Sequence, residues 1–454
     1  MVRDVHEADT PLQHYLPNVV DFSLYLRPTT STEVQEVIRH LKTSSPGHDD
    51  INIRILKECS KEITPFLIYI INKSFKEGIF ADHLKISRVV PVYKKYDKTL
   101  MENYRLISNL PSFSKIFEKI VISRLLSYLS QHSMLAPVQY GFRPKYSTQM
   151  AIHHLCKNIY DVLDRKMFQV TLVCDLSKAF DVFSHQILLE KMKVTGIRGS
   201  ALDWFSSYLS RRKQYTIYSQ AKSSLKDITL GVPQGSVLGP VLFLMYITDI
   251  VRCSEHLTFV LVADDTTIFL QGNDINTIQN TLNRELRKVS EWLNSNKLIL
   301  NTNKTQYMMH HSLMSHPDPT EIRLNDTIIN HVNEAKFLGL IIDNKLTWKT
   351  QINEIIIKRS KMTGILYRVR NNITTKCLKQ IYFCLVYPYL TYCSAIWGGA
   401  YGTLIDHIFI SQKKLVRIMF SKKSYDHTHP TFKEHSLLKI RDVISHQRAC
   451  WRCK

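Results

Sequence analysis

Asp264 and Asp265 are the residues of this chain whose types and spacing most directly suggest chemistry. They lie between the apolar runs 259–262 and 268–270, and Asp175 ends a similar run earlier in the chain. Two acids on a hairpin and a distant third can hold two Mg²⁺ ions roughly 3.5–4 Å apart, which activate an attacking hydroxyl and stabilise a pyrophosphate leaving group. Nucleotidyl transfer is therefore the first functional hypothesis.

A second acidic pair shows that neighbouring aspartates alone prove little. Asp49 and Asp50 follow Ser-Pro-Gly at 45–47, a turn-forming stretch that places acids in solvent without any chemical role. The later pair differs because 258–262 and 266–270 have the composition of strands, so its acids fall at the tip of a hairpin. This context favours a functional pair.

The segments around these acids predict a mixed α and β protein. Residues 170–174 are typical of a short buried strand that ends at Asp175, and 336–342 is a further strand candidate. Helices are expected over 184–192, 237–250 and 278–293. Together with the hairpin, these segments give the order strand, helix, strand, strand, helix, strand of a split βαβ sheet.

Helical segments are predicted on both sides of this unit. Thr30 and Glu33 form a possible capping box at the start of a helix. Further helices are expected over 64–76 and 113–129, with a strand over 87–93. From about Trp348 onward the pattern is mainly helical and basic, which indicates a separate lobe.

Composition favours a multi-lobed protein with a polyanionic partner. The 454 residues are 44% hydrophobic, and this length usually means two to four structural units. The net charge is +21, and residues 341–454 contain 20 Lys and Arg against 6 Asp and Glu. A solvated basic face is the simpler explanation, but so large an asymmetry favours binding to a polyanion.

The cysteines and the apolar segments predict a soluble, intracellular protein. Nine cysteines without repeated spacing do not suggest a disulfide framework, so a reducing compartment is expected. Residues 1–7 lack the pattern of a signal peptide. The longest apolar stretch, 383–397, is short and interrupted by proline, so no membrane partner is expected.

Eight sequence blocks together resemble one known family. They lie at 45–49, 84–95 with 103–108, 139–143, 175–181, 231–240, 262–265, 301–305 and 337–339. In order and spacing, this set resembles the reverse transcriptase domain of non-LTR retrotransposons of the jockey-like kind, over about residues 40–400. Each block alone is weak or moderate evidence, and their shared order carries the resemblance.

The resemblance implies an α+β right-hand polymerase with fingers, a ferredoxin-like palm and a helical thumb. The implied divisions are a polar leader over 1–29, fingers with an N-terminal extension over 30–165, a palm over 166–345, and a basic thumb with a C-terminal extension over 346–454. The implied activity is RNA-directed DNA synthesis, in which dNTPs extend a DNA primer on an RNA template with two Mg²⁺ ions or with Mn²⁺. The family also implies a nuclear location during DNA synthesis.

The resemblance assigns the metal ions to Asp175, Asp264 and Asp265. Hard cations such as Mg²⁺ prefer carboxylate, phosphate and water oxygens, which explains why acids are required. A helix N-cap after a strand is the alternative role for Asp175.

Three further positions resemble residues that contact the nucleotide. Phe180 matches the bulky residue beneath the sugar, where it would exclude the 2′-hydroxyl of an rNTP; an ordinary buried aromatic is the alternative. Gln234 and Gly235 match residues that touch the nucleotide and template, where the missing side chain permits close backbone approach. An ordinary Pro-Gln-Gly turn at the start of a helix is the alternative role, and such a turn can also contact the nucleotide.

Three basic residues complete the set implied by the resemblance. Lys94 and Arg105 match finger residues that hold the triphosphate through charge-assisted contacts, although isolated basic residues are usually just solvated. Lys304 matches a lysine thought able to protonate the leaving pyrophosphate, which requires a positioned donor with a suitable pKa.

Three departures from the family pattern support an alternative function. Val262 replaces an aromatic residue, Leu106 replaces proline, and Ser184 replaces an acidic or amide residue. The alternative is a catalytically decayed or truncated copy that only binds nucleic acid. Another two-metal palm enzyme, such as a nucleotide cyclase, is disfavoured by the finger and thumb blocks.

The two ends of the chain give two further expectations. The stretch before residue 30 is too short for the endonuclease domain common in such elements, so a fragment or truncated copy is expected. Cys450 and Cys453, with His446 nearby, could begin a zinc motif, but structural Zn²⁺ needs four ligands and an isolated C-x-x-C is weak evidence.

Overall fold

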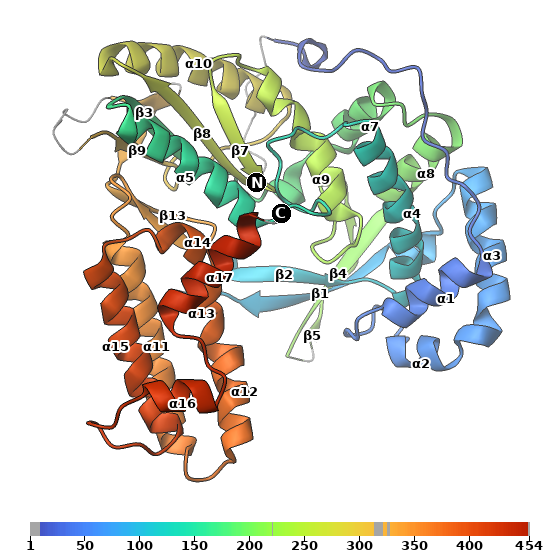
Figure 1. Ribbon diagram of the computed structural model, residues 1–454. Coiled ribbons are helices and arrows are strands. Elements are labelled where there is room, and N and C mark those ends of the chain that lie inside the picture. Colours follow the sequence, from blue (N-terminus) through green and yellow to red (C-terminus); the bar gives the residue numbers. More distant parts are fainter. Residues whose placement is uncertain (1–9, 220, 313–320, 325–326, 453–454) are drawn as a thin grey trace.

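A five-stranded sheet, called the central sheet below, lies at the upper left in Figure 1. The computed structural model describes residues 10–452 apart from 220, 313–320 and 325–326. The strands of the sheet, in spatial order, are β12 (Asn330–His331), β9 (Gln306–His310), β3 (Phe168–Asp175), β8 (Asp265–Gly272) and β7 (Thr258–Val262). β3 is antiparallel to both β8 and β9, and β7 is antiparallel to β8. In chain order the four longer strands therefore lie 4-1-3-2 across the sheet, as a split βαβ unit requires.

The fourth strand of this unit differs from the sequence prediction. The stretch 336–342 is not one strand but a hairpin of β13 (Glu334–Phe337) and β14 (Leu340–Asp343). Leu338 and Gly339 reverse the chain at φ values of +48° and +87°, a conformation that glycine adopts without a steric penalty. The prediction of a single strand is wrong because the apolar run continues through this turn, and β9 takes the fourth place.

Helices cover both faces of the central sheet, as alternating strand side chains require. α5 (Thr148–Asp164) and α10 (Ile275–Ser295) pack directly on strands of this sheet. α9 (Gly239–Ile247), with α7 (His185–Val194) packed against it, contributes to the same core as α10. α10 buries Ile278, Leu282, Leu286, Val289 and Leu293, which is the predicted apolar stripe. Leu172 and Ile268 share a core cluster with these α10 side chains, whereas Phe269 and Met308 pack on the other face in a cluster that includes α5.

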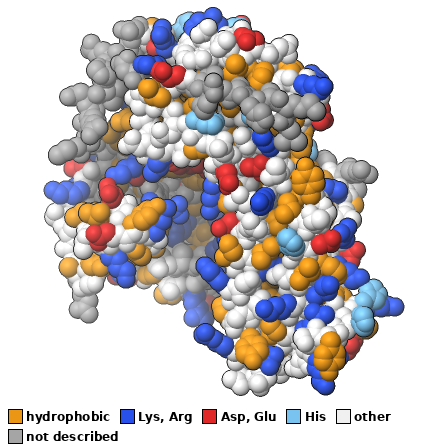
Figure 2. All heavy atoms as spheres, turned by 90° about the vertical axis from the view of Figure 1, so that its left-hand side faces the viewer, with side chains coloured by type: hydrophobic (Ala, Val, Ile, Leu, Met, Phe, Trp, Pro, Cys, Tyr) orange, Lys and Arg blue, Asp and Glu red, His pale blue; other side chains and the backbone are white. Residues whose placement is uncertain are grey.

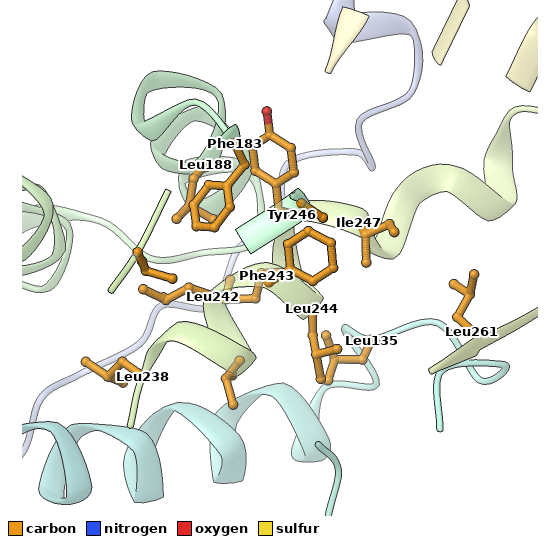
Figure 3. Packing of buried hydrophobic residues seen from close by; sticks show 14 of the residues in the cluster. Leu135, Phe183, Leu188, Leu238, Leu242, Phe243, Leu244, Tyr246, Ile247 and Leu261 are labelled. Atoms are coloured by element: carbon orange, nitrogen blue, oxygen red, sulfur yellow. The ribbon is translucent and has the colours of Figure 1, made fainter. Parts of the chain in front are cut away.

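α9 is buried on all sides, which explains its uninterrupted apolar sequence. Figure 3 shows Leu242, Phe243 and Tyr246 of this helix among side chains from other elements, including Phe183 and Leu188. The helix is shorter than the predicted 237–250 because the chain tightens into a 3₁₀ turn at Thr248–Arg252.

A second sheet lies in the middle of the view of Figure 1, and its helices form the right-hand part of the molecule. Its strands are β1 (Ile86–Tyr93), β2 (Tyr104–Asn109), β4 (Arg212–Tyr218), β5 (Ala221–Lys222) and β6 (Lys226–Ile228), in the order β2-β1-β4-β5 with β6 also paired to β4. The nearby helices are α1 (Ser31–His40), α2 (Ile53–Glu58), α3 (Ser60–Glu77), α4 (Ser112–Gln131) and α8 (Gly199–Leu209). The helices predicted over 64–76 and 113–129 and the strand over 87–93 are confirmed.

Thr30 caps α1 as predicted, but only half of the capping box forms. The Thr30 side chain accepts a hydrogen bond from the Glu33 N–H at 3.3 Å. The Glu33 carboxylate instead pairs with Arg124 of α4 at 2.8 Å. Residues before α1 also belong to the packed structure, since Tyr15 and Leu24 are buried.

The C-terminal segment is helical from residue 349 onward, as predicted. Its helices are α11 (Lys349–Val369), α12 (Thr375–Leu385), α13 (Tyr387–Thr391), α14 (Ser394–Trp397), α15 (Gly402–Met419), α16 (His429–Glu434) and α17 (Ile440–Arg452). They have a core of their own around Tyr382 and Leu415, and Trp397 joins them to the core beneath α5. Other small elements include α6 (Ala179–Val182), β10 (Arg323–Leu324) and β11 (Thr327–Ile328). Within the described ranges, no helix combines the length and the apolarity needed to cross a bilayer.

His310 at the end of β9 is a buried group that must stay neutral. Its Nδ1 donates to the Asn344 carbonyl at 2.9 Å, while its Nε2 is buried without a hydrogen-bond partner among the described residues. Burial lowers the pKa of His310 to about 4, and the nearby Asp343 and the Asn344 carbonyl offset this only in part, while His311 adds to it. A proton on Nε2 would be buried without an acceptor.

We predict that His310 makes the fold less stable in mild acid. The unfolded chain binds the proton near pH 6.5 and the folded chain only near pH 4, so stability falls as the pH drops through this window. Through His310 alone, the free energy of unfolding should be about 2 kcal/mol smaller at pH 5 than at pH 7. His310→Asn keeps the Nδ1-like donor and should remove that difference in urea unfolding. The exposed His40, whose Nδ1 bonds the Glu36 carbonyl at 2.8 Å, gives the control His40→Asn; equal effects of both substitutions would contradict the prediction.

Candidate functional site

The register between β3 and β8 brings Asp175 and Asp265 directly opposite each other. β7 and β8 form the predicted hairpin, in which Val262 pairs with Asp265 and the turn consists of Ala263 and Asp264. Asp175 thus meets the adjacent pair Asp264 and Asp265, about ninety positions later in the sequence, at one edge of the sheet. Sequence reasoning predicted this meeting, and the strand pairing produces it.

The three carboxylates repel one another electrostatically. Burial raises the pKa of Asp264, Asp175 raises it further, and a backbone N–H and Arg105 lower it. Partial burial raises the pKa of Asp265 to about 6, with contributions from Asp264 and Asp175. Like charges held this close favour a proton or a cation between them. Their oxygens are the donors that Mg²⁺ prefers.

The three carboxylates supply the oxygen donors that a hard cation prefers. Among the residues that the structure describes, however, no group of three or more His, Cys, Asp or Glu side chains is arranged to hold a metal ion. Cys450 Sγ lies 3.8 Å from a ring nitrogen of His446, and Cys453 of the possible zinc motif lies outside the described residues.

Lys304 contacts the site directly. Its Nζ lies 3.2 Å from Asp175 Oδ2. The backbone holds it there, because the Asn301 N–H donates to the Asp175 carbonyl at 2.8 Å and the Ser177 N–H donates to the Ile299 carbonyl at 2.8 Å. The loop after α10 therefore continues the pairing of β3 and carries Lys304 to the acids.

The hairpin of β1 and β2 brings Lys94 and Arg105 toward the same region. Both side chains are exposed. Arg105 lies close enough to lower the pKa of Asp264. Lys94 acts in the same way on Asp181, whose pKa burial raises overall. Two basic groups thus approach the acidic edge from the second sheet.

Phe180, Gln234 and Gly235 also lie together, on the segments that follow β3 and precede α9. The Phe180 ring contacts Phe243 at a centroid distance of 4.7 Å and remains partly exposed. Gln234 Nε2 donates to both oxygens of Asp181 at 3.0 and 2.9 Å. Gly235 has φ +131°, and a Cβ there would lie 2.4 Å from the Ser108 carbonyl oxygen. The missing side chain of Gly235 therefore allows a close approach to the backbone of β2, while its predicted contact with the nucleotide and template stays a prediction.

Two acids that sequence reasoning assigned no role support this loop. Asp181 anchors Gln234, and the fully buried Glu118 accepts hydrogen bonds from the N–H groups of Val237 at 2.6 Å and Leu238 at 3.1 Å. Asp181 falls within the 175–181 block and could have been noticed there. Glu118 gave no signal, because a single acid in a helix is usually solvated.

The structure accommodates the three departures from the family pattern. Val262 is buried in the core cluster that includes α5. Leu106 is exposed and pairs with Pro91 within a regular ladder. Ser184 accepts a hydrogen bond from the Ile187 N–H and caps α7, which is a role that Ser, Asp and Asn fill almost equally. None of the three disturbs the carboxylates.

This sheet, with three acids at one edge and basic groups facing them, is the arrangement expected of a template-dependent polymerase domain. The profile of the reverse transcriptase (RNA-dependent DNA polymerase) family matches residues 93–342, more than half of the chain. The chain therefore belongs to the reverse transcriptase family.

The most similar relatives include polymerases of insect mobile elements. The chain is 26% identical over 447 residues to the RNA-directed DNA polymerase from mobile element jockey of Drosophila funebris, covering 96% of this chain and 48% of the relative. It is 27% identical over 446 residues to the jockey polymerase of Drosophila melanogaster, covering 95% and 48%. It is 26% identical over 451 residues to the probable RNA-directed DNA polymerase from transposon BS of the same species, covering 96% and 49%. The chain thus spans about half the length of these relatives, and the resemblance to non-LTR retrotransposon polymerases is confirmed.

We predict that Gly235→Ala destabilises the protein by about 1–3 kcal/mol, the usual cost of a forced backbone conformation. The added Cβ would meet the Ser108 carbonyl oxygen and separate the loop from β2, where the Ser108 N–H now donates to the Gln234 carbonyl at 2.8 Å. The measurement is the free energy of urea unfolding. Gly402→Ala is the control, because nothing lies within 4 Å of its Cβ position. A loss no larger than that of the control would contradict the prediction.

Proposed function

We propose that this chain is an RNA-directed DNA polymerase that extends a DNA primer on an RNA template with dNTPs. The observation that carries the proposal is the direct pairing of Asp175 with Asp265, with Asp264 in the adjoining turn. The relatives' names support the same activity for those proteins. From the resemblance to this family, we also propose that the protein is nuclear during DNA synthesis.

We propose that the three parts of the structure serve as fingers, palm and thumb. Residues 30–165 would be the fingers; they contribute β1, β2 and α1–α4 to the second sheet and its helices, and α5 to the central sheet. The central sheet (166–345) would be the palm, and the C-terminal helices (346–454) the thumb. β4 and α8 lie within the palm range but belong to the second sheet and its helices, as insertions in the palm sequence would. Figure 2 shows Lys and Arg side chains around a hollow in one face of the molecule, which suits a nucleic-acid duplex.

Asp175, Asp264 and Asp265 would hold two Mg²⁺ ions, and Mn²⁺ could replace them. When bound, such ions lower the pKa of the primer hydroxyl and neutralise charge on the phosphates. The chain's own residues have further roles in this proposal. Lys304, held at Asp175, is placed to give a proton to the leaving pyrophosphate.

Lys94 and Arg105 would contact the triphosphate from the fingers side, because both approach the acidic edge. Phe180 would lie against the sugar, since its ring is held by Phe243 but remains partly exposed. A 2′-hydroxyl at that place would meet the ring, which favours dNTPs. Gln234, oriented by Asp181, would contact the nucleotide beside it.

A basic and aromatic surface on α12 is a candidate contact for the duplex backbone. Lys376, Lys379, Gln380, Phe383 and Cys384 line a shallow open depression on this helix. In the view of Figure 1, α12 forms the edge of the C-terminal helices on the same side as the second sheet. Lysines at such a surface bind phosphates without reading sequence.

We predict that the protein extends oligo(dT) on poly(rA) with dTTP and Mg²⁺, and that Asp175→Asn or Asp264→Asn lowers the rate more than about 100-fold. Loss of a metal ligand should exceed the roughly 10–100-fold cost of losing an outer-shell partner. Asp49→Asn and Asp50→Asn test the other acidic pair. Asp50 is exposed and pairs with Arg88 at 3.0 Å, so neither substitution should change the rate.

Each outcome of this assay assigns a function. Extension that survives the combined Asp175→Asn and Asp264→Asn substitutions would rule out the proposed active site. Binding of the primed template without any extension would select the alternative of a copy that only binds nucleic acid.

We predict that replacing Lys376 and Lys379 by alanine weakens binding to a primed RNA template and lowers the slope of log Kd against log salt concentration by about 1 to 2. Lys61 and Lys76 of α3 are exposed at the opposite edge of the molecule (Figure 1), and their double alanine variant is the control. Fluorescence anisotropy at several salt concentrations measures the slope. Equal slopes for the two double variants would show that α12 does not contact the backbone.

A further inference from the structure

Ala263, the first residue of the acidic turn, has an unusual backbone conformation. Its φ is +57°, in the left-handed region that residues with a Cβ rarely occupy. Such a conformation persists only where the surrounding structure holds it in place. The next residue is Asp264, so whatever fixes Ala263 also fixes the direction of a proposed metal ligand.

The Gln139 side chain provides that support. Its Oε1 accepts hydrogen bonds from the N–H of Ala263 at 3.1 Å and from the N–H of Gly141 at 2.8 Å. Gln139 is fully buried, and its Nε2 has no hydrogen-bond partner among the described residues. Of the Gln139 side chain, the amide oxygen therefore makes both hydrogen bonds to the backbone, and loss of that acceptor would leave two buried N–H groups unsatisfied.

The backbone around Gln139 is itself attached to β7. The Leu261 N–H donates to the Val138 carbonyl at 3.0 Å, and the Tyr140 N–H donates to the Leu261 carbonyl at 2.7 Å. Arg143 Nη1 donates to the Gln139 carbonyl at 3.1 Å. The segment thus lies as a short added strand along β7 and ends at the turn.

Gly141 allows the segment to approach the turn closely. A Cβ at this position would lie 2.5 Å from the Ala263 backbone nitrogen. Real Cβ atoms do not come this close to a backbone atom, so any side chain here would push the turn away. The block 139–143 was part of the family resemblance, but sequence reasoning gave it no role.

We infer that Gln139 is a positioning residue for Asp264: its buried amide oxygen holds Ala263 in the left-handed turn that directs Asp264 toward Asp175. This inference rests on the proposed function, because Asp264 matters for catalysis only if the acids bind metal ions. Gln139 contacts backbone groups of the hairpin and acts on the reaction through Asp264.

The test compares two equally buried glutamines of this sheet region. Gln139→Met keeps the length of the side chain but removes the acceptor. Gln169→Met is the matched control, because Gln169 is also fully buried and donates to Thr171 Oγ1 at 2.8 Å, but it lies at the end of β3 that is remote from Asp175. Both substitutions remove buried hydrogen bonds, so both should lower the melting temperature.

Only Gln139→Met should affect the site. We expect it to lower kcat for dTTP addition about 10-fold or more, with little change in the KM for dTTP, and to raise the dissociation constant of Mn²⁺ alone, measured by water-proton relaxation, by about the same factor. Gln169→Met should change each value less than about twofold. Gly141→Ala should lower kcat and Mn²⁺ affinity in the same way, and it carries the test if Gln139→Met does not fold.

Unchanged kcat and Mn²⁺ affinity in a folded Gln139→Met protein would overturn the inference, as would equal losses in Gln169→Met. Failure of the unsubstituted protein to extend a primer would instead contradict the proposed function, and the Mn²⁺ measurement would still decide whether Gln139 positions Asp264.

Discussion

Antiparallel pairing between β3 and β8 is the constraint on which the site depends. Because Asp175 ends one strand and Asp265 begins the other, a single register places them opposite each other. A shift of one residue would move every side chain of β8 to the other face of the sheet. Ile268 and Phe269 pack into different core clusters on the two faces, so such a shift would also destroy both cores. The hydrophobic pattern that stabilises the fold therefore also sets the geometry of the acids.

The supports of the site come from distant parts of the chain. The loop at Lys304 extends β3 from one side, and the segment that carries Gln139 extends the sheet beside β7 from the other. Glu118 reaches from α4 to hold the loop of Gln234. Each support uses backbone N–H groups as its partners, which suits a site whose loops must keep one conformation while substrates change.

Sequence patterns predicted the elements better than their connections. The stripe of α10 and the buried run of β3 were recognised because their periods are clear and long. The stretch 336–342 was misjudged because an apolar run does not show where a chain reverses, and Gly339 permits the reversal. β9 was missed because its five residues show no alternation.

The sequence likewise predicted some site residues and missed others. The acids and Lys304 were found because their types suit the chemistry and because the resemblance gave their order. Gln139 and Glu118 act through contacts between segments more than one hundred positions apart, and no local pattern encodes such contacts. Ser184 was judged a departure by residue type, whereas its function as a helix cap depends on a hydroxyl oxygen that serves as well as a carboxylate.

The central claim is that Asp175, Asp264 and Asp265 together bind two divalent cations. The most direct measurement is anomalous X-ray diffraction from crystals of the protein with a primed RNA template, soaked in Mn²⁺ and a non-reactive dNTP analogue. The account predicts two anomalous peaks roughly 3.5–4 Å apart beside the carboxylates of Asp175, Asp264 and Asp265. A well-ordered complex whose Mn²⁺ ions bind elsewhere, or a single ion that contacts none of these acids, would contradict it.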